Sequence, residues 1–421
     1  MRTAFEMMPH ADAVGTEEFS RVMDSVTGTT ASTDNRVKLL TNGDEAFPAM
    51  LAAIEGAKKR ISMEMYIIRM DSVGRRFVEA LSNAAKRGVK VRFLYDALGS
   101  RTIGDGDLEA LYAAGAEFRV FNPFINWTLV RLNNRNHRKI LVVDGRIAFL
   151  GGLNLAEDYD GDGTNGWRDS AIMVEGPAAL EAERIFEVSW ILGGWGFLGK
   201  DLPIVGLYHF KGAIDDTLLW LFGQRGTFCI PEHAAIGNGA SPVRVVSSAP
   251  DRISSPILDM YLLAVNSARK FISITNGYFT PPWVLRRALV NAAKRGVRVR
   301  LILQGPTDVP TARTKIVGYY GALLKHGVEI YEWTRSVLHA KTMVVDGIWA
   351  TVGSANLNRR GFFLNYEANV AVINPQFAAA MERQFEKDLQ HCCRVTLEKW
   401  KRRSFKQKAL EILLMPFAGQ F

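Results

Sequence analysis

The sequence predicts an α/β fold built from two tandem copies of one unit. Two observations lead to this prediction. The first is an internal repeat: "NAAKRGVKVRFL" (83–94) returns as "NAAKRGVRVRLI" (291–302), and "NHRKILVVDG" (136–145) returns as "LHAKTMVVDG" (338–347), both at an offset of roughly 200 residues. The second is that helical and strand patterns alternate within each copy, which is typical of a layered α/β sheet.

The elements of the first copy follow in order from its hydrophobic pattern. Residues 75–88, "RRFVEALSNAAKRG", carry apolar side chains at helical spacing and end in basic residues and a glycine, a typical helix stop. Residues 89–97, "VKVRFLYDA", alternate as a strand does. Residues 107–115, "DLEALYAAG", predict a second helix, and 140–145, "ILVVDG", predict a buried strand that ends at a D-G turn.

Two further pairs of segments extend the repeat. "FLGGLN" (149–154) corresponds to "TVGSAN" (351–356), and "WRDSAIMVEGP" (167–177) corresponds to "NYEANVAVINP" (365–375). Four matches in the same order are hard to obtain by chance, so we interpret the chain as a tandem duplication. We expect five segments: a loosely ordered polar start (1–35), the first unit (36–197), a linker without a counterpart (198–240), the second unit (241–393) and a basic amphipathic tail (394–421).

Charge and cysteine content limit the partners and the compartment. The 421 residues carry a formal net charge of +9 with a pI near 9.4, which favours nucleic acid or an anionic membrane surface as the partner. The chain has three cysteines, too few for a disulfide framework, and this indicates a reducing compartment. We expect neither a signal peptide nor a spanning helix, because no run of about 20 apolar residues occurs.

Each copy begins one strand with a histidine and a lysine two residues apart. Residues at this spacing share a face of a strand, so His137 and Lys139 point to one side, as do His339 and Lys341. Burying such side chains costs free energy. A single H-x-K-x4-D pattern is compatible with a strand edge whose polar side chains only make structural hydrogen bonds, and equally with a catalytic site. Two copies at matching places in the repeat favour catalysis.

The pattern H-x-K-x4-D followed by G-G/S-x-N, present in both halves, resembles the signature of the phospholipase D superfamily. The segments "NGYF" (276–279), "ATVGSANLN" (350–358) and "LNYEANV" (364–370) resemble bacterial cardiolipin synthases, and the form without amino-terminal membrane helices is the most similar. The resemblance covers about 36–393. It implies two phospholipase D-like α/β/α sandwich domains related by a pseudo-twofold axis, with both motifs in one central site.

Phosphodiester chemistry gives these residues distinct expected roles. The substrate needs its negative oxygens neutralised, and Lys139 and Lys341 supply positive charge. Asn154, Asn356 and Ser354 are candidates to bind the non-bridging oxygens. This chemistry requires no metal and no cofactor.

The histidines and acids complete the expected site. One histidine attacks phosphorus and forms a phosphohistidine, while the other transfers protons to the departing alcohol and from the incoming one. We expect His137 to be the nucleophile, although the duplication makes the pair nearly symmetric. The resemblance gives Asp169 and Glu367, which align in the repeat, the role of orienting the imidazoles. Asp144 and Asp346 close the catalytic motifs and are expected to brace the turns rather than to contact substrate.

Other motifs carry less weight. "DYDGDGTNGWRD" (158–169) has the acid spacing of a calcium loop, but it lacks flanking paired helices, and a flexible acidic loop is the favoured interpretation. Glu64 and Asp96 end predicted core strands near the expected site but lack equivalents in the second half, so a structural role is as plausible as a functional one. No Walker loop, G-x-S-x-G or zinc spacing is present.

The resemblance favours phosphatidyl transfer as the function. A cardiolipin synthase moves the phosphatidyl group of one phosphatidylglycerol to another and releases glycerol. The alternative is hydrolysis of a phospholipid or, with less support, of nucleic acid by the same covalent route; a non-catalytic lipid-binding protein is a third possibility, disfavoured by two intact motifs. The motifs leave transfer and hydrolysis open, because the choice depends on the acceptor pocket.

The tail suggests where this chemistry takes place. Seven lysines and arginines lie between Arg394 and Lys408 against one acid, Glu398, and Trp400 and Phe405 add an apolar side. This pattern fits either a membrane-surface helix or a helix packed on the body. We expect a peripheral protein on the cytoplasmic face of the bacterial inner membrane, with phosphatidylglycerol as partner and no nucleic acid, and the oligomeric state is left open.

Overall fold

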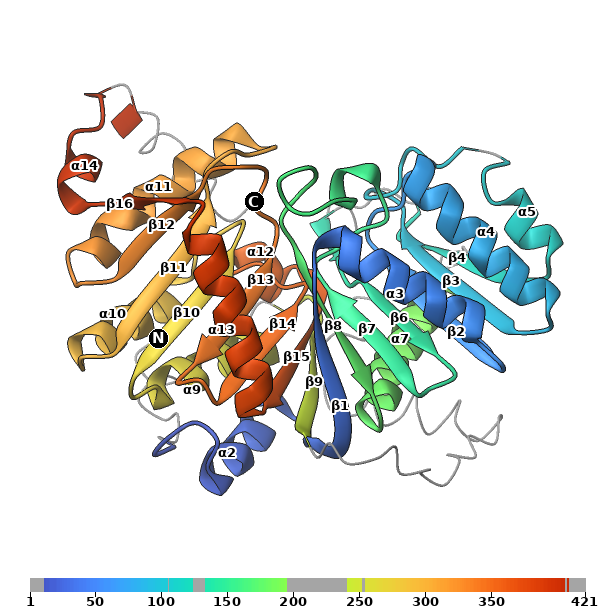
Figure 1. Cartoon of the computed structure of the whole chain (residues 1–421), viewed down its shortest axis with the longest axis horizontal. Coiled ribbons are helices and arrows are strands. Elements are labelled where there is room, and N and C mark those ends of the chain that lie inside the picture. Colours follow the sequence, from blue (N-terminus) through green and yellow to red (C-terminus); the bar gives the residue numbers. More distant parts are fainter. Residues whose placement is uncertain are drawn as a thin grey trace.

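The structure is a computed structural model that describes residues 11–104, 106–123, 133–194, 241–251, 254–405 and 407–408 (Figure 1). The linker expected at 198–240 and the last residues of the expected tail, 409–421, lie outside the described residues.

The first half alternates strands and helices as predicted. Its elements are β1 (Ser32–Thr41), α3 (Asn42–Gly56), β2 (Arg60–Met65), α4 (Ser72–Lys86), β3 (Lys90–Asp96), α5 (Glu109–Ala113), β4 (Glu117–Phe121), β5 (Arg135–Asn136), β6 (Ile140–Val143), β7 (Ile147–Gly151), the 3-10 helix η1 (Glu157–Tyr159), β8 (Ser170–Glu175) and α7 (Ala178–Gly194). The helix predicted from 75–88 begins at Ser72, where Asp71 caps it by accepting hydrogen bonds from the amides of Val73 and Gly74.

The second half repeats this plan. Its elements are β9 (Ser241–Ser248), α9 (Pro256–Ser267), β10 (Phe271–Asn276), α10 (Trp283–Lys294), β11 (Arg298–Gln304), α11 (Pro310–Leu324), β12 (Glu329–Trp333), β13 (Lys341–Val345), β14 (Trp349–Gly353), α12 (Arg359–Phe363), β15 (Asn365–Ile373), α13 (Pro375–Leu389), β16 (Cys392–Val395) and α14 (Leu397–Lys401). β16 pairs with β12 and ends two residues beyond the boundary expected for the second unit.

The strands form one mixed sheet that runs across both halves (Figure 1). Its order is β16-β12-β11-β10-β13-β14-β15-β9-β1-β8-β7-β6-β2-β3-β4, and β5 pairs with β15 off this path. Counted outwards from β9 and β1, the order is the same in both directions, so that β13 corresponds to β6 and β10 to β2. The predicted α/β fold with a tandem duplication is confirmed.

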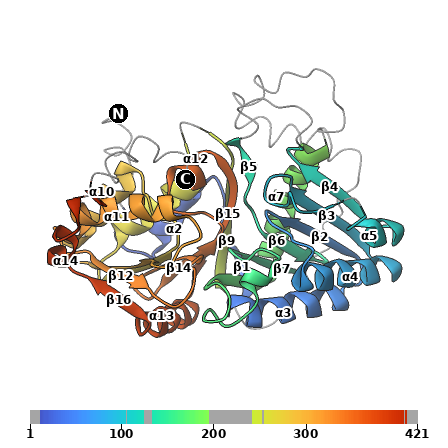
Figure 2. The same cartoon turned by 90° about the horizontal axis from the view of Figure 1, so that it is seen from above.

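Helices cover both faces of the sheet, and the two halves share a core. Figure 2 shows α3, α4 and α13 on one face, with α7 and α10 on the other. One buried cluster contains side chains from both halves, among them Val142 and Val174 of the first and Val344 and Val370 of the second. Because this apolar surface is removed from water only when the halves pack together, it stabilises their fixed arrangement.

The start of the chain is more ordered than its composition predicted. Residues 17–27 form helix α2, in which Phe19 and Met23, one turn apart, are fully buried in the core of the second half. The Thr16 side chain caps the helix by accepting a hydrogen bond from the Phe19 amide at 3.1 Å. The expectation of loose order is therefore wrong for this helix, because its apolar side chains pack on the core and Asp24 pairs with the buried Arg244.

The beginning of the tail packs on the body. The indole nitrogen of Trp400 in α14 donates to the carbonyl of Val317 at 2.9 Å, and its ring lies where a side chain on Gly321 of α11 would be. Phe405 remains 85% exposed. Among the described helices, none has the length and apolar content needed to cross a bilayer.

Candidate active site

Both histidine motifs lie where the two halves meet. β5, which precedes His137, pairs in parallel with β15 of the second half, and the His137 amide donates to the carbonyl of Tyr366 at 2.9 Å. In the equivalent place, the His339 amide donates to the carbonyl of Arg168 in the first half at 2.8 Å. The backbone of each motif is therefore held by the other half.

The side chains repeat this exchange. Nδ1 of His137 lies 3.0 Å from Glu367, and Nδ1 of His339 lies 2.6 Å from Asp169. Both carboxylates are completely buried. A carboxylate can only accept at this position, so each imidazole carries its proton on Nδ1 and keeps the lone pair on Nε2.

Burial keeps both imidazoles neutral. It lowers the pKa of His137 to about 4, although the nearby Glu367 opposes the shift. Burial and the charge of Lys341 lower the pKa of His339 to about 3, against the opposing effect of Asp169. Lys341 also contributes to lowering the pKa of His137, and Lys139 to lowering that of His339. The two motifs are thus within electrostatic range of each other.

The two motif lysines are buried beside the histidines. Nζ of Lys139 donates to the carbonyl of His137 at 2.6 Å, and Nζ of Lys341 donates to that of His339. Burial lowers the pKa of Lys139 to about 7 and that of Lys341 to about 8, with Glu367 and Asp169 opposing the shifts. An arriving anion would favour the charged form of both lysines.

Known families and relatives match most of the chain. The family described as "Cardiolipin synthase, PLD-like domain" matches residues 50–190 and 261–389. The chain is 35% identical over 373 residues to "Cardiolipin synthase" of Clostridium perfringens, which covers 88% of this chain and 74% of the relative. It is also 35% identical over 396 residues to "Cardiolipin synthase 1" of Bacillus cereus, which covers 93% and 74%.

The chain belongs to the cardiolipin synthase family of phospholipase D-like proteins. A solved structure, phosphatidylserine synthase of Haemophilus influenzae, shares its fold with a TM-score of 0.67 at 16% identity and covers 95% of this chain and 97% of the other. The predicted resemblance is confirmed.

In this family member, aromatic rings surround the histidines in a way that the sequence did not reveal. The ring of Tyr66 packs 4.8 Å from that of His137. Three rings approach His339: Tyr159 at 5.3 Å, Trp167 at 5.5 Å and Tyr278 at 6.0 Å. These rings pack against the two buried imidazoles and so limit the access of water to them.

The residues expected to bind phosphate are used in different ways. Oδ1 of Asn154 accepts from the Ile67 amide at 3.0 Å, and its Nδ2 donates to the Tyr159 hydroxyl at 2.7 Å. The Ser354 hydroxyl donates to Glu367 at 2.5 Å, so it supports the acid that holds His137. Asn356 differs, because its buried Oδ1 has no hydrogen-bond partner within the described part of the chain. An amide oxygen only accepts hydrogen bonds, so this atom can meet a donor group and not a phosphate oxygen.

The two motif aspartates lie away from the histidines. Asp144 is five residues beyond Lys139, roughly 15 Å along the strand. Its carboxylate accepts from the backbone amides of residues 58–60, and that of Asp346 accepts from residues 269–271. Both aspartates have positive φ angles, as do the glycines that follow them in the D-G turns. These aspartates brace the turns and lie too far from the histidines to contact the reacting groups.

Glu64 and Asp96 hold the segment that leads to His137. Asp96 accepts from the Asn136 amide at 3.0 Å, and Asn136 Nδ2 donates to Glu64 at 3.2 Å. Both acids are fully buried, and burial raises the pKa of each. Both acids therefore have a structural role, because they fix Asn136, the residue before His137.

The acidic loop at 158–169 is not arranged as a metal site. Asp158 pairs with Arg69, and Asp160 with an arginine of α4 at 3.3 Å. Asp162 accepts from two amides of its own loop, and Asp169 holds His339. Over the described residues, no cluster of three or more acidic, histidine or cysteine side chains is suited to a metal ion.

Proposed function

We propose that the chain transfers the phosphatidyl group of one phosphatidylglycerol to a second one, forming cardiolipin and releasing glycerol. The observation that carries this proposal is the pair of buried, neutral imidazoles, each held through Nδ1 by a carboxylate of the other half. The relatives named cardiolipin synthase support the choice of substrate.

In the first step, Nε2 of His137 attacks the phosphorus of the donor lipid. A phosphorus–nitrogen bond forms as the bond to the glycerol oxygen breaks, and His339 gives its proton to that oxygen. The negative charge of the bound phosphodiester raises the pKa of both imidazoles, which lets His339 carry this proton. Glu367 stabilises the positive charge that develops on His137.

In the second step, neutral His339 accepts the proton of a hydroxyl group on the second phosphatidylglycerol. The hydroxyl oxygen attacks phosphorus, and the bond to His137 breaks, which restores the free enzyme. Lys139 and Lys341 hold the non-bridging oxygens as charge builds up in both steps, with Nδ2 of Asn356 as a further donor. Exclusion of water by the aromatic walls favours the alcohol over hydrolysis.

We further propose that the two units, 36–197 and 241–393, act together as one phosphatidyltransferase at a membrane surface. The net charge of +9 supports binding to anionic lipid. The cytoplasmic face of the inner membrane is the location that fits the cysteine content and this charge.

The proposal is tested with purified protein and phosphatidylglycerol in detergent micelles. Cardiolipin and glycerol should appear in equal amounts, and neither should form with His137→Ala. Phosphatidic acid as the main product would instead establish a phospholipase, and cleavage of DNA without lipid turnover would establish a nuclease.

A further inference from the structure

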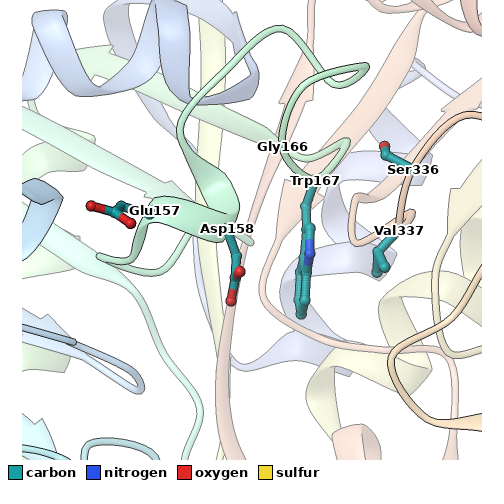
Figure 3. A pocket seen from close by; sticks show the side chains of 6 residues that line it. All are labelled: Glu157, Asp158, Gly166, Trp167, Ser336 and Val337. Atoms are coloured by element: carbon teal, nitrogen blue, oxygen red, sulfur yellow. The ribbon is translucent and has the colours of Figure 1, made fainter. Parts of the chain in front are cut away.

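A pocket of about 420 Å³ lies beside the candidate active site, between the two halves. Its lining consists of Glu157, Asp158, Gly166, Trp167, Ser336 and Val337 (Figure 3). The volume is within the usual range for small-ligand sites. Trp167 connects the pocket to the chemistry, because its ring packs 5.5 Å from that of His339.

The walls of the pocket are held in place by hydrogen bonds between the halves. The Ser336 hydroxyl donates to the carbonyl of Gly163 at 2.6 Å, and the Arg168 amide donates to the carbonyl of Val337 at 2.9 Å. On the other side, the Trp167 amide donates to the carbonyl of Asp158 at 2.7 Å. The pocket is therefore formed before any ligand arrives.

The lining accepts hydrogen bonds and repels anions. It contains two carboxylates and no lysine, arginine or histidine. Figure 3 shows the side chain of Asp158 beside the indole of Trp167, with Val337 on the other side of the ring. Asp158 pairs with Arg69, but a carboxylate has more acceptor sites than one arginine uses. The Ser336 hydroxyl donates its own proton to Gly163 and accepts from the indole nitrogen of Trp333 at 3.3 Å, which leaves one acceptor site for a ligand.

A neutral polyol fits these properties. Its hydroxyl groups are donors for Asp158 and Ser336, and its carbon atoms can lie against the indole of Trp167. A phosphate group inside the pocket would lie next to the Asp158 carboxylate, and the lining supplies no cation beyond the Arg69 that already pairs with it. Cations are found just outside instead, where Arg69 and Arg335 flank the lining.

We propose that this pocket binds the glycerol headgroup of the acceptor lipid and directs one of its hydroxyl groups to His339. The inference rests on the proposed transferase function and extends it to the acceptor. In the acceptor step, His339 takes the proton of the held hydroxyl, the oxygen bonds to phosphorus, and the phosphorus–His137 bond breaks. The pocket thus selects a polyol, rather than water or a simple alcohol, as the second substrate.

Glycerol exchange provides the test, because free glycerol should enter the same pocket. Wild-type protein is given phosphatidylglycerol micelles and isotopically labelled glycerol, and label in the lipid is measured against glycerol concentration. Asp158→Asn should raise the half-saturating glycerol concentration by roughly tenfold, since it removes a charged hydrogen-bond acceptor. The maximal rate at saturating glycerol should fall much less. The preference for glycerol over 1-propanol as acceptor should shrink by a similar factor.

Asp160→Asn is the matched control. Asp160 lies two residues away on the same loop and also pairs with an arginine, but it does not line the pocket. It should leave the half-saturating concentration and the alcohol preference as in the wild type. If the two variants have the same half-saturating glycerol concentration and the same alcohol preference, the proposed acceptor pocket is wrong, whereas the transferase function is unaffected. A wild-type protein that incorporates no label and forms no cardiolipin would overturn both proposals.

Discussion

Glu367 lies 3.0 Å from Nδ1 of His137, although 230 residues separate them in sequence and they belong to different halves of the duplication. The relationship is reciprocal, because Asp169 of the first half holds His339 of the second. Each half therefore supplies a histidine to the site and the acid for the other half's histidine. A single copy of the unit lacks the acid partner for its own motif, which explains why the two halves must pack in one fixed arrangement.

Replacing Glu367 with glutamine should preserve the fold and remove most of the activity. The amide is nearly isosteric, and Ser354 and Asn365 can still hydrogen-bond to it. It no longer stabilises the imidazolium that forms during attack, so kcat should fall by about 10²–10⁴-fold. Cardiolipin formation and far-UV circular dichroism test this expectation, with Glu386→Gln on the exposed face of α13 as the control. Wild-type turnover in Glu367→Gln would remove this acid from the mechanism.

The nucleophile can be identified by trapping the covalent intermediate. We expect a rapidly quenched reaction to leave the phosphatidyl group on the peptide that contains His137, and mass spectrometry locates it. His339→Asn should still accumulate some of this adduct, because it retains the nucleophile and slows the acceptor step. His137→Asn should form none. An adduct on His339 in the wild type would reverse the assigned roles.

The buried lysines predict loss of activity at alkaline pH. The pKa of Lys139 is lowered to about 7 and that of Lys341 to about 8, mainly by burial. As the pH rises through this range, the free enzyme loses the ammonium charges that attract a phosphodiester, so kcat/KM should decline. His137 must be neutral to attack phosphorus, and its pKa is lowered to about 4, so its protonation should reduce kcat/KM only below about pH 4. His339 must carry a proton in the first step, and its pKa in the free enzyme is lowered to about 3, so its deprotonation reduces kcat/KM in the same direction as loss of the lysine charges.

The bound substrate should shift this loss of activity to higher pH. Its negative charge raises the pKa of both lysines, so the decline in kcat should occur at higher pH than the decline in kcat/KM. Initial rates over a pH series in micelles give both profiles, with a return to pH 7 to exclude unfolding. A kcat/KM that stays constant from pH 7 to 10 would contradict a role for the lysine charges.

The histidine and lysine motifs and the duplication could be predicted from sequence, because identical short segments recur at one offset. The exchange of acids could not be assigned. Asp169 and Glu367 were recognised as equivalent, but which histidine each one contacts depends on how the halves pack. The aromatic walls could not be predicted for a related reason: Tyr159 and Trp167 lie in a segment with the acid spacing of a calcium loop, and nothing in its sequence shows that it packs against His339. The helix at 17–27 could not be predicted because its buried residues Phe19 and Met23 lie in a mainly polar segment of the sequence.

The exposed basic residues of the tail should contribute to membrane binding. Trp400 packs against α11 and is not free to insert into a membrane. The exposed side chains of Lys399, Lys401 and Arg402 can therefore contribute to membrane binding mainly through their charge. Each basic residue near an anionic surface adds on the order of 1 kcal/mol. Reversing all three to glutamate should weaken binding to vesicles that contain phosphatidylglycerol by more than about tenfold, as measured by co-sedimentation.

The control for this variant reverses three exposed lysines elsewhere, Lys38, Lys58 and Lys59, which changes the net charge equally. It should bind more tightly than the tail variant. Equal loss in the two variants would indicate a general charge effect, and unchanged binding of the tail variant would show that the tail does not hold the protein on the membrane.

The ion pair between Arg168 and Asp388 should be essential for stability and for the position of His339. Nη2 of Arg168 lies 2.8 Å from Asp388 of α13, both side chains are buried, and the carbonyl of the same arginine accepts from the His339 amide. Asp388→Ala leaves a buried guanidinium without its counter-charge, so the free energy of unfolding should fall by about 3–5 kcal/mol. Glu181→Ala breaks an exposed ion pair with Arg184 and should cost less than about 1 kcal/mol. Urea unfolding compares the two variants, and equal midpoints would show that the buried pair contributes no more than a surface one.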